Sequence, residues 1–209
     1  MLPAFIYPLL MLKNTIRYFD FGYYLRFAGL FFLLYLTYTF VIAASAPTGT
    51  YYPIVDKFLN FPVLIRFLIL HIGQFVLSLL GYTTTVVDDK LISDEGSSVL
   101  KMAWACYGLG LKSFWIAFIC AHQMSLKKKI VWSLIGVFTI FFLNCTRVVV
   151  MMISMVEKWT IAEYLGTNAH DLFNYLCYAA LFGLILLFYA KNKTKSQLDS
   201  VTPSKAQYS

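Results

Sequence analysis

The sequence predicts an all-α protein, a polytopic bundle of transmembrane helices with a small extracytoplasmic segment. Of its 209 residues, 60% are hydrophobic and only 13% are Asp, Glu, Lys or Arg. Soluble globular domains carry about 25% charged residues, roughly twice this share. The apolar residues also fall into runs of about 20 residues, the length that an α-helix needs to cross a bilayer. Low charge and long apolar runs together predict several membrane-spanning helices.

Four apolar stretches are clear candidates for membrane spans, and a fifth stretch is ambiguous. The ambiguous one, residues 62–81, has the length of a span. It contains Arg66, His71 and Gln74, and such residues are costly at mid-bilayer depth. We favour an interfacial or re-entrant helix for it, and a crossing helix is the open alternative. The clear candidates are residues 27–46, 100–121, 130–152 and 171–190.

Basic clusters predict which ends of these spans face the cytoplasm. Lys127, Lys128 and Lys129 lie between two spans, and a second cluster follows the last span from Lys191 onward. Short cytoplasmic loops are enriched in Lys and Arg, so both clusters are expected in the cytoplasm. The span at 100–121 then runs inward, 130–152 runs outward, and 171–190 runs inward.

Outside these spans, the sequence predicts three further features. Lys13, Arg17 and Arg26 favour a cytoplasmic N-terminus, which makes 27–46 an outward span. The outer loop 82–99 begins with the β-branched segment "YTTTVVDDKLI", which is typical of a short β-hairpin. The polar, basic segment 191–209 shows no periodicity and is expected to be a disordered cytoplasmic tail.

We therefore expect three regions along the chain. Residues 1–99 form an N-terminal membrane region, residues 100–190 form a three-helix membrane core, and residues 191–209 form the tail. The net charge of +7 would suggest nucleic-acid binding in a soluble protein. Here the basic residues lie beside apolar runs, so we expect contact with membrane lipid and none with nucleic acid. The four cysteines form no CxxC pair and no zinc-like spacing, so neither a metal nor another cofactor is expected.

Three chemically distinctive residues are predicted to reach one depth from separate helices. Cys106 would lie roughly 10 Å below the outer start of its inward helix, at 1.5 Å per residue. Asn144 and Arg147 fall in the outer part of the outward helix, and His170 lies at the outer end of the last helix. The topology therefore predicts a thiol, a guanidinium and an imidazole together near the outer surface.

These three groups suit nucleophilic catalysis. A thiol attacks a carbonyl as its thiolate, which apolar burial disfavours. A histidine can take the thiol proton, and a fixed positive charge can stabilise a thiolate or an oxyanion. Arginine keeps its charge near lipid, and Gly108 and Gly110 would let a substrate backbone approach closely. The residues thus predict a Cys106–Arg147–His170 active site, and a purely structural polar cluster is the alternative.

Three short motifs at these positions resemble those of the exosortase/archaeosortase family of integral membrane cysteine transpeptidases. They are "ACYGL" at 105–109, "NCTR" at 144–147 and "NAH" at 168–170. The resemblance covers about residues 95–190 and is closest to the compact bacterial members. The sequence departs from the family at Tyr107, where a small polar residue is common.

The resemblance implies a cysteine transpeptidase or protease in a bacterial cytoplasmic (inner) membrane, with its active site facing outward. Its substrates would be exported proteins that end in a short motif, an apolar helix and a basic tail. Cys106 would be the nucleophile, His170 the general base and acid, and Arg147 the stabilising cation. The residues expected to contact substrate are Tyr107, Gly108 and Asn144.

Two other classes of protein compete with this interpretation. In a non-catalytic scaffold or partner subunit, Arg147 would pair with Asp171 or Glu157, and Cys106 would only pack. In a small transporter, Arg147 would bind an anionic solute. A transporter of that kind is expected to have paired half-helices or an internal repeat, and the sequence shows neither.

Overall fold

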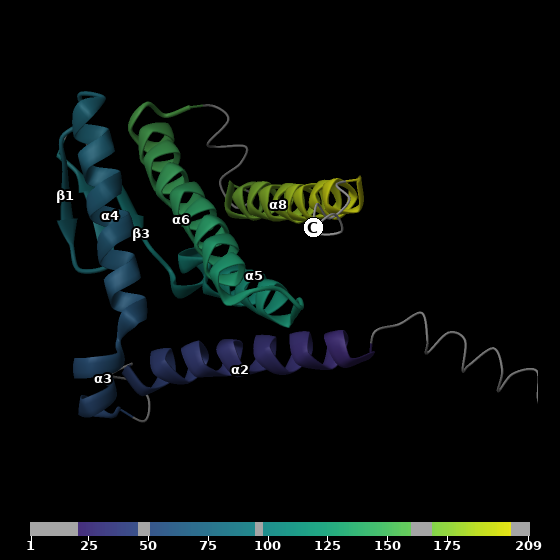
Figure 1. Cartoon of the computed structure of the whole chain (residues 1–209). Coiled ribbons are helices and arrows are strands. Elements are labelled where there is room, and N and C mark those ends of the chain that lie inside the picture. The colour runs from purple at the N-terminus through teal and green to yellow at the C-terminus, as the bar shows by residue number, and fades with distance from the viewer. Residues whose placement is uncertain (1–20, 46–50, 95–97, 160–168, 202–209) are drawn as a thin grey trace, which may run out of the picture. The chain divides into compact units, whose positions relative to one another are not determined.

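The structure is a computed structural model that describes residues 21–45, 51–94, 98–159 and 169–201, with no side chain described at 105, 169–172 and 192–201. It confirms a mostly helical protein with one small sheet (Figure 1). In chain order the elements are α2 (Phe21–Ser45), α3 (Pro53–Leu59), α4 (Phe61–Leu79), β1 (Thr84–Val87), β2 (Lys90–Ser93), β3 (Val99–Lys101), the 3-10 helix η1 (Trp104–Tyr107), α5 (Leu109–Ala121), α6 (Leu126–Val156) and α8 (Ala169–Val201).

Four segments of the described chain have the length and apolar composition of a membrane span. Much of their apolar surface is not covered by protein, since Leu33 and Phe142 are each more than half exposed. Large apolar side chains exposed in this number are typical of surfaces that lipid covers. The four segments are Phe21–Ser45, Phe61–Leu79, Leu126–Val156 and Phe173–Lys191. The chain is therefore a multi-pass membrane protein.

The chain divides into two compact units. One consists of Met1–Asn60 with Leu109–Ser133, and the other of Phe61–Gly108 with Leu134–Ser209. This division does not follow the boundary at residue 99 that the sequence suggested, because α5 belongs to the same unit as α2. The helix α6 begins in the first unit and continues through the second.

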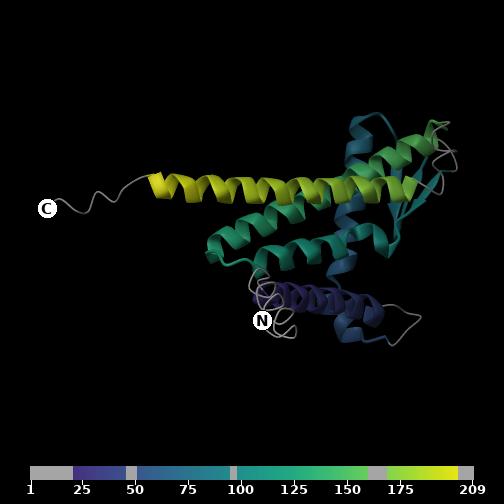
Figure 2. The ribbon, with the colours of Figure 1, turned by 90° about the vertical axis from the view of Figure 1, so that its right-hand side faces the viewer.

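In the first unit, α2 packs along α5 (Figure 2), and aromatic side chains of the two helices meet. The Phe114 ring lies edge-on to Phe27, with ring centroids 5.2 Å apart, and Tyr23 meets His122 at 4.7 Å. The fully buried Trp115 donates its indole N–H to the Trp132 carbonyl oxygen over 2.8 Å. Within its unit, α5 thus packs against α2 and is bonded to the first turns of α6.

The prediction of one membrane span over residues 100–121 is wrong. Residues up to Lys101 belong to β3, the backbone at Ala103 is extended, and η1 follows. Gly108 then adopts a left-handed conformation, with φ 64° and ψ 23°, so the regular helix begins only at Leu109. With 13 residues, α5 is about 20 Å long at 1.5 Å per residue, and a hydrocarbon core is about 30 Å thick.

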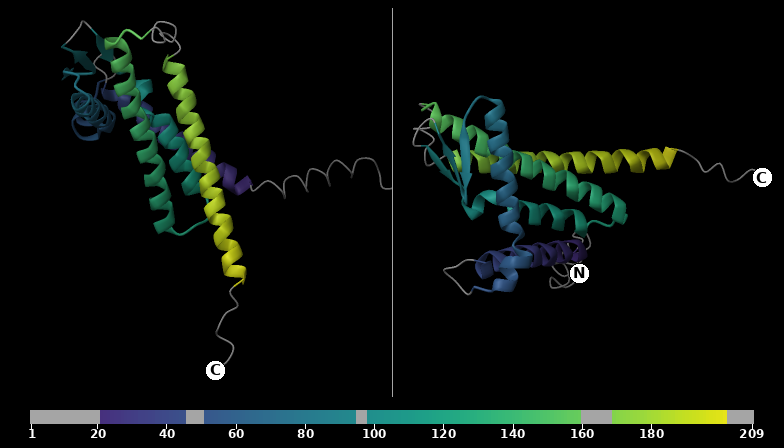
Figure 3. Two further views of the ribbon diagram at one scale, coloured as in Figure 1. Left: turned by 90° about the horizontal axis from the view of Figure 1, so that it is seen from above. Right: turned by 90° about the vertical axis from the view of Figure 1, so that its left-hand side faces the viewer.

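In the second unit, the three-stranded sheet lies along α4 (Figure 3). The order of its strands is β1-β2-β3, and both neighbouring pairs are antiparallel. The predicted hairpin is confirmed: β1 and β2 are joined at Asp88, whose φ of 54° is a left-handed value that aspartate tolerates in tight turns. Leu91 is fully buried, so the sheet contributes to the core of this unit.

The polar residues of α4 find partners within the second unit. The Arg66 guanidinium lies 5.9 Å from the centre of the Trp104 ring, and His71 bonds through Nδ1 to the Phe67 carbonyl oxygen. Gln74 donates to the Thr84 carbonyl oxygen over 2.7 Å. Polar groups with partners are far cheaper to place at membrane depth than unpaired ones. The length and composition of α4 therefore favour the crossing alternative for residues 62–81 over the interfacial one.

The prediction of a disordered tail over 191–209 is wrong for residues 191–201, because α8 continues to Val201 (Figure 2). The segment contains no Gly or Pro, and Lys, Gln and Leu are good helix formers. Extending an existing helix also avoids the cost of a new nucleus. Residues 202–209 lie outside the described part of the chain.

The Gln74–Thr84 hydrogen bond fixes β1 to α4, so its loss should destabilise the second unit. Gln74→Met keeps the volume of the side chain but leaves a sheet carbonyl without its donor. We expect a loss of about 1–3 kcal/mol in the free energy of unfolding, the cost of one unsatisfied group. Thermal unfolding in detergent micelles measures it. Ser78→Ala is the control, because the Ser78 hydroxyl donates within α4, to the Phe75 carbonyl oxygen. An equal loss in both variants would contradict the assignment.

Candidate active site

Cys106 lies in η1, in the short connection between β3 and α5, and not inside a membrane helix as the sequence suggested. Its side chain is partly exposed. The Cys106 N–H donates to the Ala103 carbonyl oxygen over 2.9 Å, which closes the turn. The thiol therefore stands on a tight turn, where it is more exposed than the buried Cys145 and Cys177 and has the same intermediate exposure as Cys120 on α5.

The turn can approach α6 because residue 108 is glycine. A Cβ atom added there would lie 2.7 Å from Asn144 Nδ2 and 2.9 Å from Ile140 Cγ2. The positive φ of Gly108 is also a conformation that L-residues with side chains rarely adopt. Both the space and the backbone conformation therefore require glycine, and together they set Cys106 against α6.

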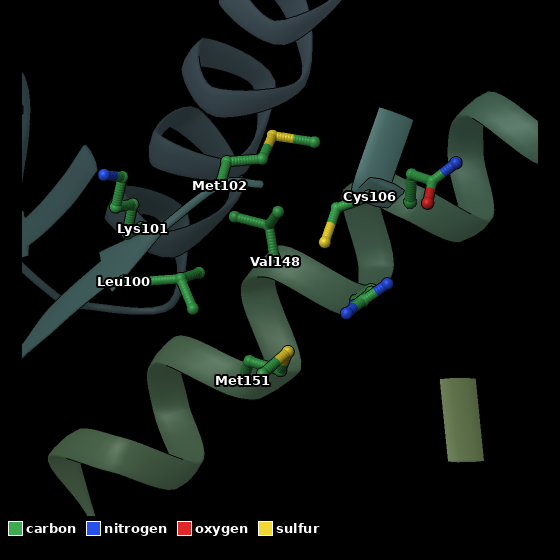
Figure 4. Close-up of a pocket in the computed structure, with 8 residues that line it drawn as sticks. Leu100, Lys101, Met102, Cys106, Val148 and Met151 are labelled. Carbon is green, nitrogen blue, oxygen red and sulfur yellow. The ribbon is translucent and has the colours of Figure 1, made fainter. Parts of the chain in front are cut away.

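Cys106, Asn144 and Arg147 line one small cavity of about 40 Å³ (Figure 4). The Cys106 sulfur points toward Val148 on α6, and Leu100 approaches from β3. This volume holds a few water molecules but no peptide, so a larger ligand could place only one group inside it. The remaining lining residues are Lys101, Met102 and Met151.

Arg147 is the most unusual residue of the cavity, because its side chain is only 6% exposed. It makes no hydrogen bond or ion pair with any side chain that the structure describes. Glu157, one expected partner, instead accepts a hydrogen bond from the Tyr82 hydroxyl at 2.9 Å. The other expected partner, Asp171, has a side chain outside the described part. A buried guanidinium beside a thiol favours anions in the cavity.

Asn144 links the turn to α6. Its Nδ2 donates to the Ile140 carbonyl oxygen one turn earlier, over 2.9 Å, and its side chain is 4% exposed. No described group donates to its Oδ1. That oxygen can therefore accept a hydrogen bond from a group that enters the cavity.

Tyr107, expected beside the substrate, has a side chain that is only 1% exposed. Its ring packs 5.3 Å from that of Trp104, at an angle of 58°. Burial raises the pKa of the Tyr107 phenol above its usual value, and the nearby Arg66 guanidinium offsets part of this rise. The structure thus places Tyr107 in the core, and a contact with substrate stays a prediction.

Sequence reasoning missed the connection between Arg66 and the turn that carries Cys106. The available signal was an arginine inside an apolar stretch, a residue that is costly at mid-bilayer depth unless it has a partner. Arg66 instead lies over Trp104 and influences Tyr107, the two aromatic residues that flank the cysteine. This pairing joins residues about 40 positions apart, and helical periodicity carries no information about such contacts.

His170 belongs to the first turn of α8, but its side chain lies outside the described part of the structure. Its role beside Cys106 therefore stays a prediction. Of the other cysteines, Cys145 and Cys177 are buried, and Cys120 lies on α5. Gly110, expected near the substrate, lies on α5 within reach of Tyr38. Among the described residues, no group of three or more His, Cys, Asp or Glu could hold a metal ion.

No protein-family model matches the chain, and no significant match occurs among curated proteins or solved structures. Support for a function therefore comes from the chemistry of the cavity. It combines a partly exposed thiol, a buried positive charge and an amide oxygen. The guanidinium can stabilise a thiolate, or the oxyanion that forms when a thiolate adds to a carbonyl group, and the amide oxygen can accept a hydrogen bond from a bound group.

Gly108→Ala should destabilise the protein and displace the thiol. The left-handed conformation costs a residue with a side chain about 1–2 kcal/mol, and overpacking against Asn144 adds about 1–3 kcal/mol. We expect a combined loss of about 2–5 kcal/mol in the free energy of unfolding, measured by thermal unfolding.

Gly183→Ala on α8 is the matched control, since a Cβ there meets nothing within 4 Å. It should be neutral or slightly stabilising, because alanine favours a helix interior by about 0.5–1 kcal/mol. Equal effects of the two substitutions would show that the turn tolerates a side chain.

Proposed function

We propose that the protein is a membrane-embedded cysteine transpeptidase or protease that cleaves C-terminal sorting signals of exported proteins. The observation that carries this proposal is the cavity shared by Cys106 and Arg147. Arg147 is buried there without a described counter-ion. A charge held in that way is more consistent with a transient anion than with simple helix packing.

The reaction proceeds through an acyl-enzyme. The Cys106 thiolate adds to the carbonyl carbon of the scissile peptide bond, and Arg147 stabilises the negative oxygen of the tetrahedral intermediate. The C–N bond then breaks, and the amine leaves with the proton that the thiol gave up, carried by His170 in this proposal. Water or an acceptor amine next attacks the thioester and releases the Cys106 thiolate.

The position of the cavity along α6 supports an outward-facing site. Arg147 lies 19 residues beyond Lys128, which is about 28 Å along the helix axis at 1.5 Å per residue. The basic cluster around Lys128 is expected in the cytoplasm, so we expect the cavity at the outer end of this helix. The Tyr82–Glu157 hydrogen bond joins the C-terminal ends of α4 and α6 there. Because the motifs resemble those of the exosortase/archaeosortase family, the proposal also places the protein in a bacterial inner membrane.

Cys106→Ala and Cys106→Ser should abolish processing of a co-expressed exported protein that ends in a motif, an apolar helix and a basic tail. Arg147→Lys keeps the charge but not the guanidinium fork, and we expect a loss of about 10²–10³ in rate. Immunoblots of precursor and product measure both effects, with the level of each variant checked in the membrane.

Cys120→Ser is the matched control and should process the substrate normally. Detection of a thioester between Cys106 and the substrate fragment by mass spectrometry would be direct support. Normal processing by Cys106→Ala would overturn the proposal and leave a scaffold role.

A membrane-impermeant thiol reagent added from outside should label Cys106, which is partly exposed, far faster than the buried Cys145 and Cys177. Mass mapping of labelled peptides from intact cells measures the difference. Labelling only after the membrane is permeabilised would contradict an outward-facing site.

A further inference from the structure

We propose that the open edge of β3 binds an extended peptide as a fourth strand and delivers it to the Cys106 cavity. The peptide would pair through its backbone, so the ligand class is a segment in β conformation and not one particular side chain. This inference rests on the proposed function for its biological meaning. The binding itself depends only on the sheet.

The register of the sheet leaves one edge of β3 without partners among the residues that the structure describes. Leu91 pairs with Leu100, and the flanking bonds run from the Met102 N–H to the Asp89 carbonyl and from the Ser93 N–H to the Ser98 carbonyl. In an antiparallel pair such bonded positions alternate with unbonded ones. The N–H and C=O groups of Val99 and Lys101 therefore point away from β2. No described group bonds to them, and both side chains are exposed.

This edge continues directly into the cavity. Leu100, Lys101 and Met102 line the same space as Cys106. The Lys101 ammonium group points away from it (Figure 4) and lies 3.7 Å from Asp89. A strand added to a sheet lies about 4.8 Å from its neighbour and advances about 3.3 Å per residue. A peptide paired with Val99 and Lys101 would thus present its next one or two residues to Cys106.

A peptide ligand would need a binding surface outside the cavity. Its volume of about 40 Å³ admits one small group, such as a carbonyl, and not the residues on either side of it. Main-chain hydrogen bonds at a sheet edge are a common means of binding extended peptides. The opposite edge of the sheet is less suited, because Gln74 already donates to the outward Thr84 carbonyl of β1.

The inference can be tested by capture of a peptide probe on Cys106 of the full-length protein in detergent. The probe is a threonine–valine hexapeptide with a C-terminal cysteamine, supplied as its mixed disulfide with 2-mercaptoethanol. The Cys106 thiolate displaces 2-mercaptoethanol and forms a disulfide with the probe. The concentration of 2-mercaptoethanol that halves the capture, read by mass spectrometry, then reports peptide binding beside Cys106.

Val99→Pro and Lys101→Pro each remove one outward N–H and leave the bonds between β2 and β3 intact. Each should lower the half-capture concentration about tenfold, the effect of one lost hydrogen bond near the upper end of its usual range. Val86→Pro is the matched control, because its N–H faces the outer edge of β1, and it should capture the probe normally. Capture of cysteamine without a peptide should be equal in all variants, which shows that the turn is intact.

A second probe tests the unmodified protein. Its alternate backbone nitrogens carry methyl groups, so they cannot donate hydrogen bonds to β3, and its half-capture concentration should fall as in the proline variants. Equal capture of the hexapeptide and of plain cysteamine would overturn the inference. So would a wild-type dimer that Val99→Pro dissociates, because a second copy would then occupy the edge. If Cys106→Ala still processes substrate while capture depends on β3, the proposed catalysis fails and the binding edge stands.

Discussion

The contact between the Gly108 backbone and α6 is the constraint on which the candidate site depends. It brings a tight turn close to Asn144 and Ile140, closer than any side chain at position 108 would allow. This tight turn places Cys106 against the part of α6 that carries Arg147. Without this close approach, the thiol and the guanidinium would belong to two segments with no shared cavity.

The opposite side of the same turn is held by aromatic and cationic groups. Trp104 and Tyr107 lie one 3-10 turn apart, so they share a face, and Arg66 of α4 lies over that face. The polar residues of α4 therefore have a structural purpose that their position in an apolar helix conceals. They attach α4 to the turn and, through Gln74, to the sheet. Burying such groups with partners costs little, whereas leaving them in lipid costs several kcal/mol each.

The described part of the structure tests one of the two partners expected for Arg147 in a scaffold, Glu157. A scaffold in which Arg147 pairs with Glu157 does not fit the structure, because Glu157 is bonded to Tyr82 at the end of α6. A transporter would require a solute pathway, and the cavity around Arg147 holds only a few water molecules. A thiol and a buried guanidinium in one cavity support the proposed reaction on a carbonyl group.

The sequence by itself determined the elements that meet lipid, because an apolar run of sufficient length has no stable alternative to a helix in a bilayer. The helices near 27–46, 130–152 and 171–190 could be predicted on that ground, and the hairpin at 84–93 from its β-branched residues. It also pointed to Cys106, Asn144 and Arg147, which do share a cavity. Only the tertiary structure decided that residues 100–121 break into a strand, a turn and a short helix. That break depends on pairing with β2 and on the left-handed Gly108 against α6, and contacts between distant segments leave no periodic trace in the sequence.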